Sequence, residues 1–492
     1  MRPPTPATVL QQTFGHRGFR GMQAGVIDRL LAGGHSMYLA PTGSGKSLAY
    51  QVPALAVPGA GGLPGVAVVL SPLIALMQDQ VAALRGRGVA ATFLNSSLGR
   101  AERERREADL AAGKFRLLYV TPERFRKPAF RDAMSKVKVS LLAVDEAHCV
   151  SAWGHDFRPD YSRVGEIREA VSSPTTIALT ATATPDVQAD IARQLGLTIG
   201  DGPDQLRVFH EGVARPNLSL DVRPVYGDDE KLAAIRETAC GSAGPAVVYF
   251  TLIQTLRRFS EALRSARVPH VCYHGDLDAR QRRSVQDAFM SDEPGVSLVL
   301  ATNAFGMGID KPDIRAVVHA ELPGSLEAYA QEIGRAGRDG QPSTCTLLYD
   351  EADLATQMRF QEWAHPDTEF YERLHHHLEH DAERIAAEGL DWLREKLHAK
   401  QGRHDRRLDT ALGLLERHGT LGPDADWRDP DHPHLPLTGD LAPALRDADR
   451  LAEQLKRAQR RLYALVQYTQ HGGDRAVFLN EYFHGRTPSA LG

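Results

Sequence analysis

Two groups of residues in this chain have the types and spacing that phosphate chemistry needs. The first is Pro41-Thr42-Gly43-Ser44-Gly45-Lys46-Ser47, where glycines let backbone N–H groups close around phosphate oxygens. In such a loop Lys46 reaches the β- and γ-phosphates and Ser47 binds Mg²⁺. The second is Asp145-Glu146-Ala147-His148, which places two carboxylates side by side. The sequence therefore predicts a phosphate-binding loop and, farther along, a paired-acid motif.

The elements that must position these residues are buried parallel strands. A strand at 37–40 precedes the glycine loop and a helix follows from Leu48, which is the order that a phosphate loop requires, although Ala40 stands where the strict pattern has glycine. The apolar run 140–144 delivers the two acids to the carboxyl edge of a sheet, where open α/β sheets bind ligands. Similar runs predict strands at 66–70, 116–120 and 176–179. One helix-alternating domain therefore occupies about residues 10 to 205.

Two aromatic segments accompany this pattern. Residues 149–161, directly after the acids, are dense in aromatic and charged side chains. The residues for phosphate chemistry and the aromatic residues that could stack on a ligand are thus neighbours in the chain. We expect the two functions to be coupled. The other segment, 14–23, lies in a stretch of helical pattern at 8–35. Considered alone, it is a capped helix entry whose phenylalanines pack in the core.

A second α/β pattern begins near residue 228 and has no phosphate loop of its own. Its predicted strands are 246–250, 270–274, 297–301 and 316–319. Arg335 and Arg338 follow in a glycine-spaced segment, where small neighbours let a guanidinium approach a phosphate closely. A surface turn with a salt bridge is an equally good interpretation of the two arginines by themselves.

The chain changes character after about residue 350. Helices rich in Glu, Arg and His run to about 419, and residues 409–419 could end a helix–turn–helix unit. Residues 420–438 then form a hairpin wing or a plain loop, and a long amphipathic helix spans about 443 to 471. His375-His376-His377 and His380 fit a solvated helix face better than a metal site.

Composition is typical of a globular protein: 42% of the 492 residues are hydrophobic and 24% are charged. The length favours two to four domains. The net charge of -4 leaves room for a local basic groove. Four scattered cysteines, without a CxxC pair, indicate a reducing compartment and no thiolate metal site. Since no run is long enough to span a bilayer and no secretory signal is visible, we expect a cytoplasmic protein, nucleoid-associated in a bacterium, with no membrane partner.

With the phosphate loop, the acids, the threonine segment 180–184 and the paired arginines in this order, the chain resembles superfamily 2 helicases. Three features narrow the resemblance to the RecQ family. They are the block 14–23, the aromatic loop 153–159, and the segment 304–308 followed by 334–340. The resemblance covers roughly residues 8 to 350. It implies two tandem RecA-like parallel-sheet domains that bind ATP and Mg²⁺.

For the nucleotide site, the resemblance implies a role for each matching residue. Gln23 would hydrogen-bond adenine, with Phe19 and Arg20 shaping the pocket. Asp145 would position the metal through water, and Glu146 would orient and deprotonate the attacking water. The remaining implied residues are Thr42, Gly43, Ser44, Gly45, Lys46, Ser47 and Asp310 for binding, with Ser47 on Mg²⁺, and Arg335 and Arg338 for catalysis, Arg338 being the arginine finger.

The resemblance also implies a DNA-binding loop and a relay. The loop residues are Trp153, His155, Phe157 and Arg158, which would couple single-stranded DNA binding to hydrolysis. His148, Thr180 and Thr182 would relay between the nucleotide cleft and the DNA. The implied partners are single-stranded DNA and tailed or branched duplexes, bound by a monomer.

The chain departs from the family at its C-terminus. RecQ proteins usually carry a four-cysteine zinc subdomain after the motor, and residues 465–483 resemble its beginning. Asp474 stands where the first cysteine would be, so we predict that no zinc is bound. The predicted domains are 1–207 and 208–350, both RecA-like, and a mostly helical region at 351–492. That region holds a candidate winged helix at about 367–440 and a degenerate zinc-region remnant at 443–485.

The sequence thus predicts an ATP-dependent 3′–5′ DNA helicase of RecQ type that acts in repair and recombination. Three alternatives stay open. A translocase without efficient unwinding is favoured by the missing zinc subdomain. An inactive ATP-gated DNA clamp is opposed by the intact Lys46, Glu146 and Arg338. An RNA helicase is opposed by the aromatic loop.

Overall fold

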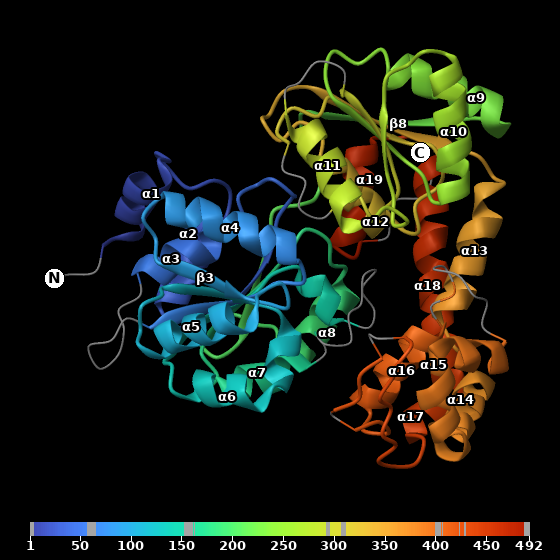
Figure 1. The fold of residues 1–492 in the computed structure, drawn as a ribbon. Helices are drawn as coiled ribbons and strands as arrows, with labels where there is room; N and C mark the ends of the chain where they lie inside the picture. The colour runs from blue at the N-terminus through green and yellow to red at the C-terminus, as the bar shows by residue number, and fades with distance from the viewer. Residues whose placement is uncertain are drawn as a thin grey trace. The chain divides into compact units, whose positions relative to one another are not determined.

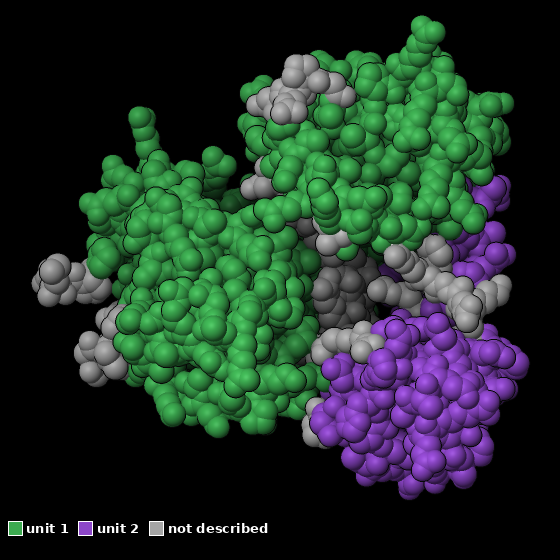
Figure 2. Space-filling model, in the orientation of Figure 1, with its two compact units in different colours: residues 1–350, 468–492 green, residues 351–467 purple. Residues whose placement is uncertain are grey.

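The chain folds into two compact units, residues 1–350 with 468–492 and residues 351–467 (Figure 2). The computed structural model describes residues 4–56, 65–151, 161, 163–291, 296–306, 311–398, 405, 407–422, 424–427 and 430–486. Within the described residues, no helix combines the length and apolar character needed to cross a bilayer.

The first sheet is seven-stranded and wholly parallel, in the order β3-β4-β2-β5-β6-β1-β7. Its strands are short and mostly fully buried, as expected for a sheet covered on both faces. They are β1 (His35–Leu39), β2 (Val66–Leu70), β3 (Ala91–Leu94), β4 (Leu117–Val120), β5 (Val139–Val144), β6 (Thr175–Thr180) and β7 (Leu206–His210).

Alternate residues of these strands point to opposite faces, and each face has its own helices (Figure 1). One face packs on α1 (Pro6–Phe14), α2 (Gln23–Leu31), α3 (Leu48–Ala56) and α4 (Ile74–Gly86). The other packs on α5 (Arg100–Ala111), α6 (Pro128–Ser135), α7 (Val164–Ala170) and α8 (Pro185–Gln194). Two short 3-10 helices, η2 (Pro122–Arg126) and η3 (Ala147–Val150), follow β4 and β5.

The second sheet is six-stranded and parallel, in the order β10-β11-β9-β12-β13-β8. Its strands are β8 (Leu218–Pro224), β9 (Ala246–Tyr249), β10 (Val271–Tyr273), β11 (Leu298–Ala301), β12 (Ala316–His319) and β13 (Ser343–Tyr349). Its helices are α9 (Gly227–Thr238), α10 (Ile253–Ser265), α11 (Ala279–Met290) and α12 (Leu326–Ile333). α9 and α10 cover one face, and Tyr329 of α12 packs against His319 on the other. The prediction of two parallel-sheet domains is confirmed.

Several sequence-based details need correction. The helical stretch predicted at 8–35 is two helices, because Gly15 ends α1 in a left-handed conformation and α2 begins only at Gln23. Four strands were not predicted: β3, β7, β8 and β13. The predicted domain boundary at 207 falls inside β7, which pairs with β1 and so belongs to the first sheet.

Residues 351–467 have a separate core. Their helices are α13 (Asp353–Ala364), α14 (Thr368–His380), α15 (Ala382–Lys396), α16 (Arg407–Arg417), α17 (Pro443–Arg446) and most of α18 (Ala448–Gln470). Antiparallel bridges join Leu421 to Leu437 and Asp426 to His434, so the segment after α16 is the hairpin and not the plain loop. The winged helix at about 367–440 stays a prediction. His376 and His380 are exposed on α14.

Candidate active site

The phosphate loop connects β1 to α3 in the predicted order. Gly43 and Gly45 adopt φ values of 81° and 83°, which side-chain-bearing residues rarely adopt. The Lys46 ammonium is folded back into the loop, where it donates to Ala40 O at 2.9 Å and Pro41 O at 3.2 Å. Burial lowers the pKa of Lys46, and the nearby Glu146 carboxylate opposes that shift. The loop therefore holds its lysine among exchangeable carbonyl partners that a phosphate could replace.

Gln23 connects the N-terminal block to the same loop. Its side chain is 1% exposed, accepts from Arg20 N at 3.0 Å, and donates to Ser44 O at 3.1 Å and Gly45 O at 3.2 Å. Phe19 is partly buried against the first-domain core. Gln23 thus lies against the phosphate loop, and an adenine that bound its amide would compete with these backbone partners.

The two acids follow β5 at the sheet edge that the sequence predicts. Asp145 N donates to Leu70 O at 2.8 Å, and Asp145 Oδ1 accepts from Glu146 N at 3.1 Å. Burial raises the pKa of Asp145, the Glu146 carboxylate raises it further, and Lys46 opposes the shift. Glu146 has a left-handed backbone with φ 48°. The lysine and the acids therefore interact electrostatically in one buried site.

The predicted relay residues are in contact. His148 Nδ1 lies 3.0 Å from Thr180 Oγ1, which also donates to Thr182 O at 3.3 Å and accepts from Thr182 N at 3.2 Å. The Thr180 hydroxyl has one proton, so when it donates to Thr182 O, His148 Nδ1 must be the donor in the first contact. Its Nε2 can then accept from Gln331 Nε2, which lies 3.4 Å away. The sequence did not assign Gln331, although it stands in the arginine-bearing segment.

The two arginines have different surroundings. A Cβ at Gly43 would lie 2.9 Å from Arg338 Cγ, so the arginine stem packs on this glycine of the phosphate loop. Thr42 Cβ similarly lies 3.1 Å from a Cβ placed at Gly334. Arg335 is 8% exposed and donates to Gly306 O within the second sheet domain. The structure therefore brings Arg338, and not Arg335, to the phosphate loop.

A further residue, Glu211, holds the N-terminal block and escaped sequence analysis. Its Oε1 accepts from Tyr38 OH at 2.7 Å and from Met22 N at 2.6 Å. These contacts join the end of β7 to β1 and to the block that contains Gln23. A lone glutamate after an unpredicted strand carries no sequence signal for this role. The predicted DNA-loop residues Trp153, His155, Phe157 and Arg158, and Asp310 of the nucleotide site, lie outside the described residues.

The donor set fits a nucleotide with Mg²⁺. Ser44 Oγ and Glu146 Oε2 are buried and make no hydrogen bond among the described residues, although Glu146 Oε2 lies 3.4 Å from His148 Nδ1. Such orphaned polar atoms are costly unless a ligand or water satisfies them. No cluster of three or more potential metal-ligating His, Cys, Asp or Glu side chains occurs in the described part of the chain.

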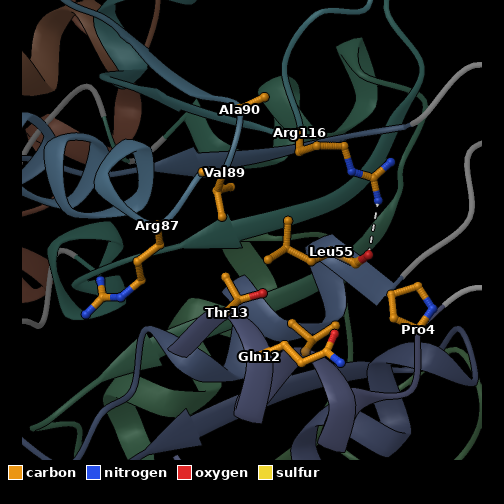
Figure 3. Close-up of a pocket in the computed structure, with 10 residues that line it drawn as sticks. Pro4, Gln12, Thr13, Leu55, Arg87, Val89, Ala90 and Arg116 are labelled. Carbon is orange, nitrogen blue, oxygen red and sulfur yellow. Dashed lines mark hydrogen bonds between the residues drawn. The ribbon is translucent and has the colours of Figure 1, made fainter. Parts of the chain in front are cut away.

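A separate cavity of about 350 Å³ lies away from these residues (Figure 3). Its lining includes Gln12 of α1, Leu55 of α3 and Val89 before β3, with Arg87 and Arg116 among its polar residues. Arg116 is tied to the α3 terminus, where it donates to Ala54 O at 2.9 Å. None of the predicted site residues lines this cavity.

Comparisons with known proteins agree with this geometry. Residues 20–191 match the DEAD/DEAH box helicase family, and residues 230–340 match the helicase conserved C-terminal domain. ATP-dependent DNA helicase RecQ of Pasteurella multocida is 40% identical over 351 residues, which are 71% of this chain and 53% of the relative. The probable ATP-dependent DNA helicase RecS of Bacillus subtilis is 39% identical over 357 residues, which are 71% of this chain and 68% of the relative.

Among solved structures, helicase Lhr of Mycobacterium smegmatis, bound to single-stranded DNA and AMP-PNP, superposes with a TM-score of 0.56. It is 19% identical, and the match covers 90% of this chain and 61% of Lhr, which supports the fold. This chain spans about half the length of the RecQ relatives it matches first. These relatives and the two family matches show that the chain belongs to the RecQ family of superfamily 2 helicases.

Proposed function

We propose that this protein is an ATP-dependent DNA helicase that couples hydrolysis to 3′–5′ movement along single-stranded DNA. The observation that carries the proposal is the convergence of Lys46, the acid pair Asp145-Glu146 and Arg338 on one glycine loop. Phosphoryl transfer is catalysed almost entirely by positioning and charge stabilisation, which these residue types supply.

In the proposed reaction, different groups of the chain bind the phosphates, accept a proton and stabilise charge. Backbone N–H groups of the loop and the Lys46 ammonium bind the phosphates. Glu146 accepts the proton of the attacking water, and the Arg338 guanidinium stabilises charge that develops on the γ-phosphate. Ser47, with Asp145 through water, would hold Mg²⁺, which when bound neutralises charge on the β- and γ-phosphates.

Coupling to DNA is assigned to the relay and the aromatic loop. Contacts run from Glu146 to His148, and from His148 to Thr180 and Gln331. They support a route by which a movement of Thr180 or Gln331 would change the position of the Glu146 carboxylate. Trp153 in the adjoining loop would stack on a DNA base. Stacking on an aromatic side chain is worth about 1–3 kcal/mol, and a DNA base-pair step about 1.4 kcal/mol, so capture of frayed bases can offset strand separation.

The deciding experiment combines phosphate release with strand separation. Single-stranded DNA should stimulate ATP hydrolysis, and ATP should separate a 3′-tailed duplex while leaving a 5′-tailed duplex intact. If single-stranded DNA does not raise the rate of ATP hydrolysis by the wild-type protein, the proposal is wrong. Equal stimulation by RNA and DNA would favour the RNA-helicase alternative.

A translocase that does not unwind efficiently is the second candidate. Asp474, at the position of the family's first zinc-binding cysteine, serves here as a helix cap. Its Oδ1 accepts from Ala476 N at 2.7 Å and Val477 N at 3.3 Å, so the side chain has a structural role without metal. Displacement of a protein roadblock from single-stranded DNA, with no separation of a forked duplex, would favour this candidate.

A further inference from the structure

The loop that carries Arg335 and Arg338 is held by the connection between the two sheets. Arg215, between β7 and β8, donates to Gly334 O and Gly337 O, both at 3.3 Å, and to Ala336 O. Asn217 Nδ2 donates to Gly337 O at 2.8 Å. The guanidinium thus lies at the C-terminal end of α12, where orphaned carbonyls and the negative end of the helix dipole favour a cation. One side chain therefore binds three carbonyl groups of the arginine-bearing loop.

The same connection is held in turn by α19 (Arg475–Phe483). Asn480 Oδ1 accepts from Val213 N at 2.9 Å and from Ala214 N at 3.3 Å. The His484 ring lies 4.0 Å from the His210 ring. Residues 468–492 are compactly grouped with residues 1–350, so these contacts lie within one unit. The C-terminal helix therefore fixes the backbone directly before Arg215.

The first half of α12 is also held, by Tyr482 of α19 and by Tyr468 near the end of α18. Tyr482 OH donates to Glu327 Oε1 at 2.8 Å, and Tyr468 OH donates to Tyr329 OH at 3.2 Å. Glu327 is 2% exposed, so the hydroxyl of Tyr482 satisfies an otherwise costly buried carboxylate oxygen. Both ends of the helix that precedes Arg338 are thus braced, its start directly and its end through Arg215.

We propose that Arg215 and Asn480 are positioning residues for Arg338. This inference rests on the proposed ATP hydrolysis. Asn480 fixes the backbone at 213–214, Arg215 binds the carbonyls of residues 334, 336 and 337, and Arg338 follows directly in the chain. An arginine finger acts only if its guanidinium is positioned on the transition state to within a fraction of an ångström. Loss of the contacts of Arg215 or of Asn480 should therefore lower turnover. In the described part of the chain, the side-chain hydrogen bonds of Arg215 and Asn480 go to residues 334–337 and 213–214 and not to the phosphate loop, so we expect ATP binding in the ground state to be unchanged when they are replaced.

The test separates turnover from binding. Asn480→Ala removes the acceptor for two backbone N–H groups and should lower kcat of DNA-stimulated hydrolysis about tenfold, with KM for ATP unchanged. Asn480→Asp keeps an oxygen acceptor for both N–H groups and should restore most of kcat. Arg215→Lys keeps the charge but replaces the two terminal nitrogens of the planar guanidinium by a single ammonium, so it should resemble Asn480→Ala. Val477→Ala, a change of an exposed side chain on the same helix, is the matched control and should equal wild type.

A second readout tests the route through Arg338. Asn480→Ala should weaken binding of ADP with aluminium fluoride, a transition-state mimic, while leaving ADP binding intact. In an Arg338→Ala background, Asn480→Ala should cause no further weakening, because two residues on one route are not additive. Equal kcat in Asn480→Ala and wild type, additive losses in the double variant, or failure of Asn480→Asp to rescue would each overturn the inference. If wild type itself shows no DNA-stimulated hydrolysis, the proposed function fails instead.

Discussion

Glu146 shows at the scale of one residue how the fold serves the chemistry. A side-chain-bearing residue with φ 48° has an unfavourable backbone, at a cost of about 1–3 kcal/mol, which the surrounding structure must outweigh. The buried β5 strand before it and η3 after it supply that constraint. The resulting turn leaves Glu146 Oε2 buried, without a hydrogen bond among the described residues and 3.4 Å from His148 Nδ1. This arrangement is compatible with the proposed role of Glu146, which is to bind and deprotonate a water molecule.

The first prediction concerns the acid and the lysine. Glu146→Gln keeps the shape of the side chain but removes the base, and should lower kcat about 10²- to 10⁴-fold. Lys46→Ala should also abolish measurable turnover, because it removes a phosphate-binding charge. Single-stranded DNA binding, measured by fluorescence anisotropy, should persist in both variants. Normal phosphate release by either one would refute the role assigned to that residue.

The second prediction concerns the relay hydroxyl. Thr180→Val keeps the side-chain volume but removes the oxygen that His148 and Thr182 contact at 3.0 and 3.2 Å. We expect DNA stimulation of hydrolysis to fall several-fold while hydrolysis without DNA changes less. Thr238→Val on α9, where the hydroxyl donates to Ala234 O at 2.7 Å, is the matched control. Equal stimulation in the Thr180 variant and the control would remove Thr180 from the relay.

At the scale of elements, the attachment of α19 near β7 predicts a pH dependence. His210 Nδ1 accepts from Gly212 N at 3.0 Å, which requires an unprotonated nitrogen. Burial, followed by the nearby His484, lowers the pKa of His210 to about 4. The unfolded chain, with a histidine pKa of about 6.5, then binds the proton more readily than the folded chain.

The third prediction follows from the lowered pKa of His210 in the folded chain. The contribution of His210 to stability is complete above about pH 6.5 and is lost as the pH falls toward 4. The thermal midpoint should therefore decrease over this window, and less so in His210→Gln, which does not titrate. Similar slopes of midpoint against pH in wild type and His210→Gln would contradict the prediction.

At the scale of the whole molecule, charge is unevenly shared between the two compact units. Residues 351–467 contain 23 acidic and 17 basic side chains, whereas the complete chain has 62 and 58. Non-specific DNA binding depends on lysine and arginine contacts to phosphates. The remaining residues, with 39 acidic and 41 basic side chains, have a net charge of +2, which is more favourable for contact with DNA phosphates than the net charge of -6 of residues 351–467.

The fourth prediction places this DNA contact in the loop after the acids. Trp153→Ala should leave hydrolysis without DNA intact but remove most of its stimulation by single-stranded DNA, since a stacked base contributes about 1–3 kcal/mol. Tyr463→Ala changes an exposed aromatic residue of α18 and is the matched control. Undiminished stimulation in the Trp153 variant would count against the coupling role of the loop.

The fifth prediction concerns zinc. The purified chain should contain no stoichiometric zinc, and treatment with a zinc chelator should change neither its melting temperature nor its hydrolysis once Mg²⁺ is restored. The reason is that Asp474 caps α19 where the family pattern has a cysteine, and the four cysteines are scattered. One zinc per chain by elemental analysis would be incompatible with this prediction.

The sequence by itself determined the elements that have strong local signals. Buried parallel strands appear as short apolar runs, and spaced glycines between a strand and a helix indicate a phosphate loop, so β1, β2, β5 and the phosphate loop could be predicted. The acids and threonines were placed correctly because they follow such strands. β7 and β8 were missed, because their alternating and partly exposed residues resemble ordinary loop sequence.

Only the tertiary structure decided which distant residues meet. It assigned Arg338 to the phosphate loop and Arg335 to the Gly306 carbonyl, although both stand in the same glycine-spaced segment. It also joined Asn480 to the backbone at 213–214, across more than half of the chain. Local spacing encodes backbone conformation, whereas these contacts depend on how remote elements pack, and no local pattern of residues specifies that packing.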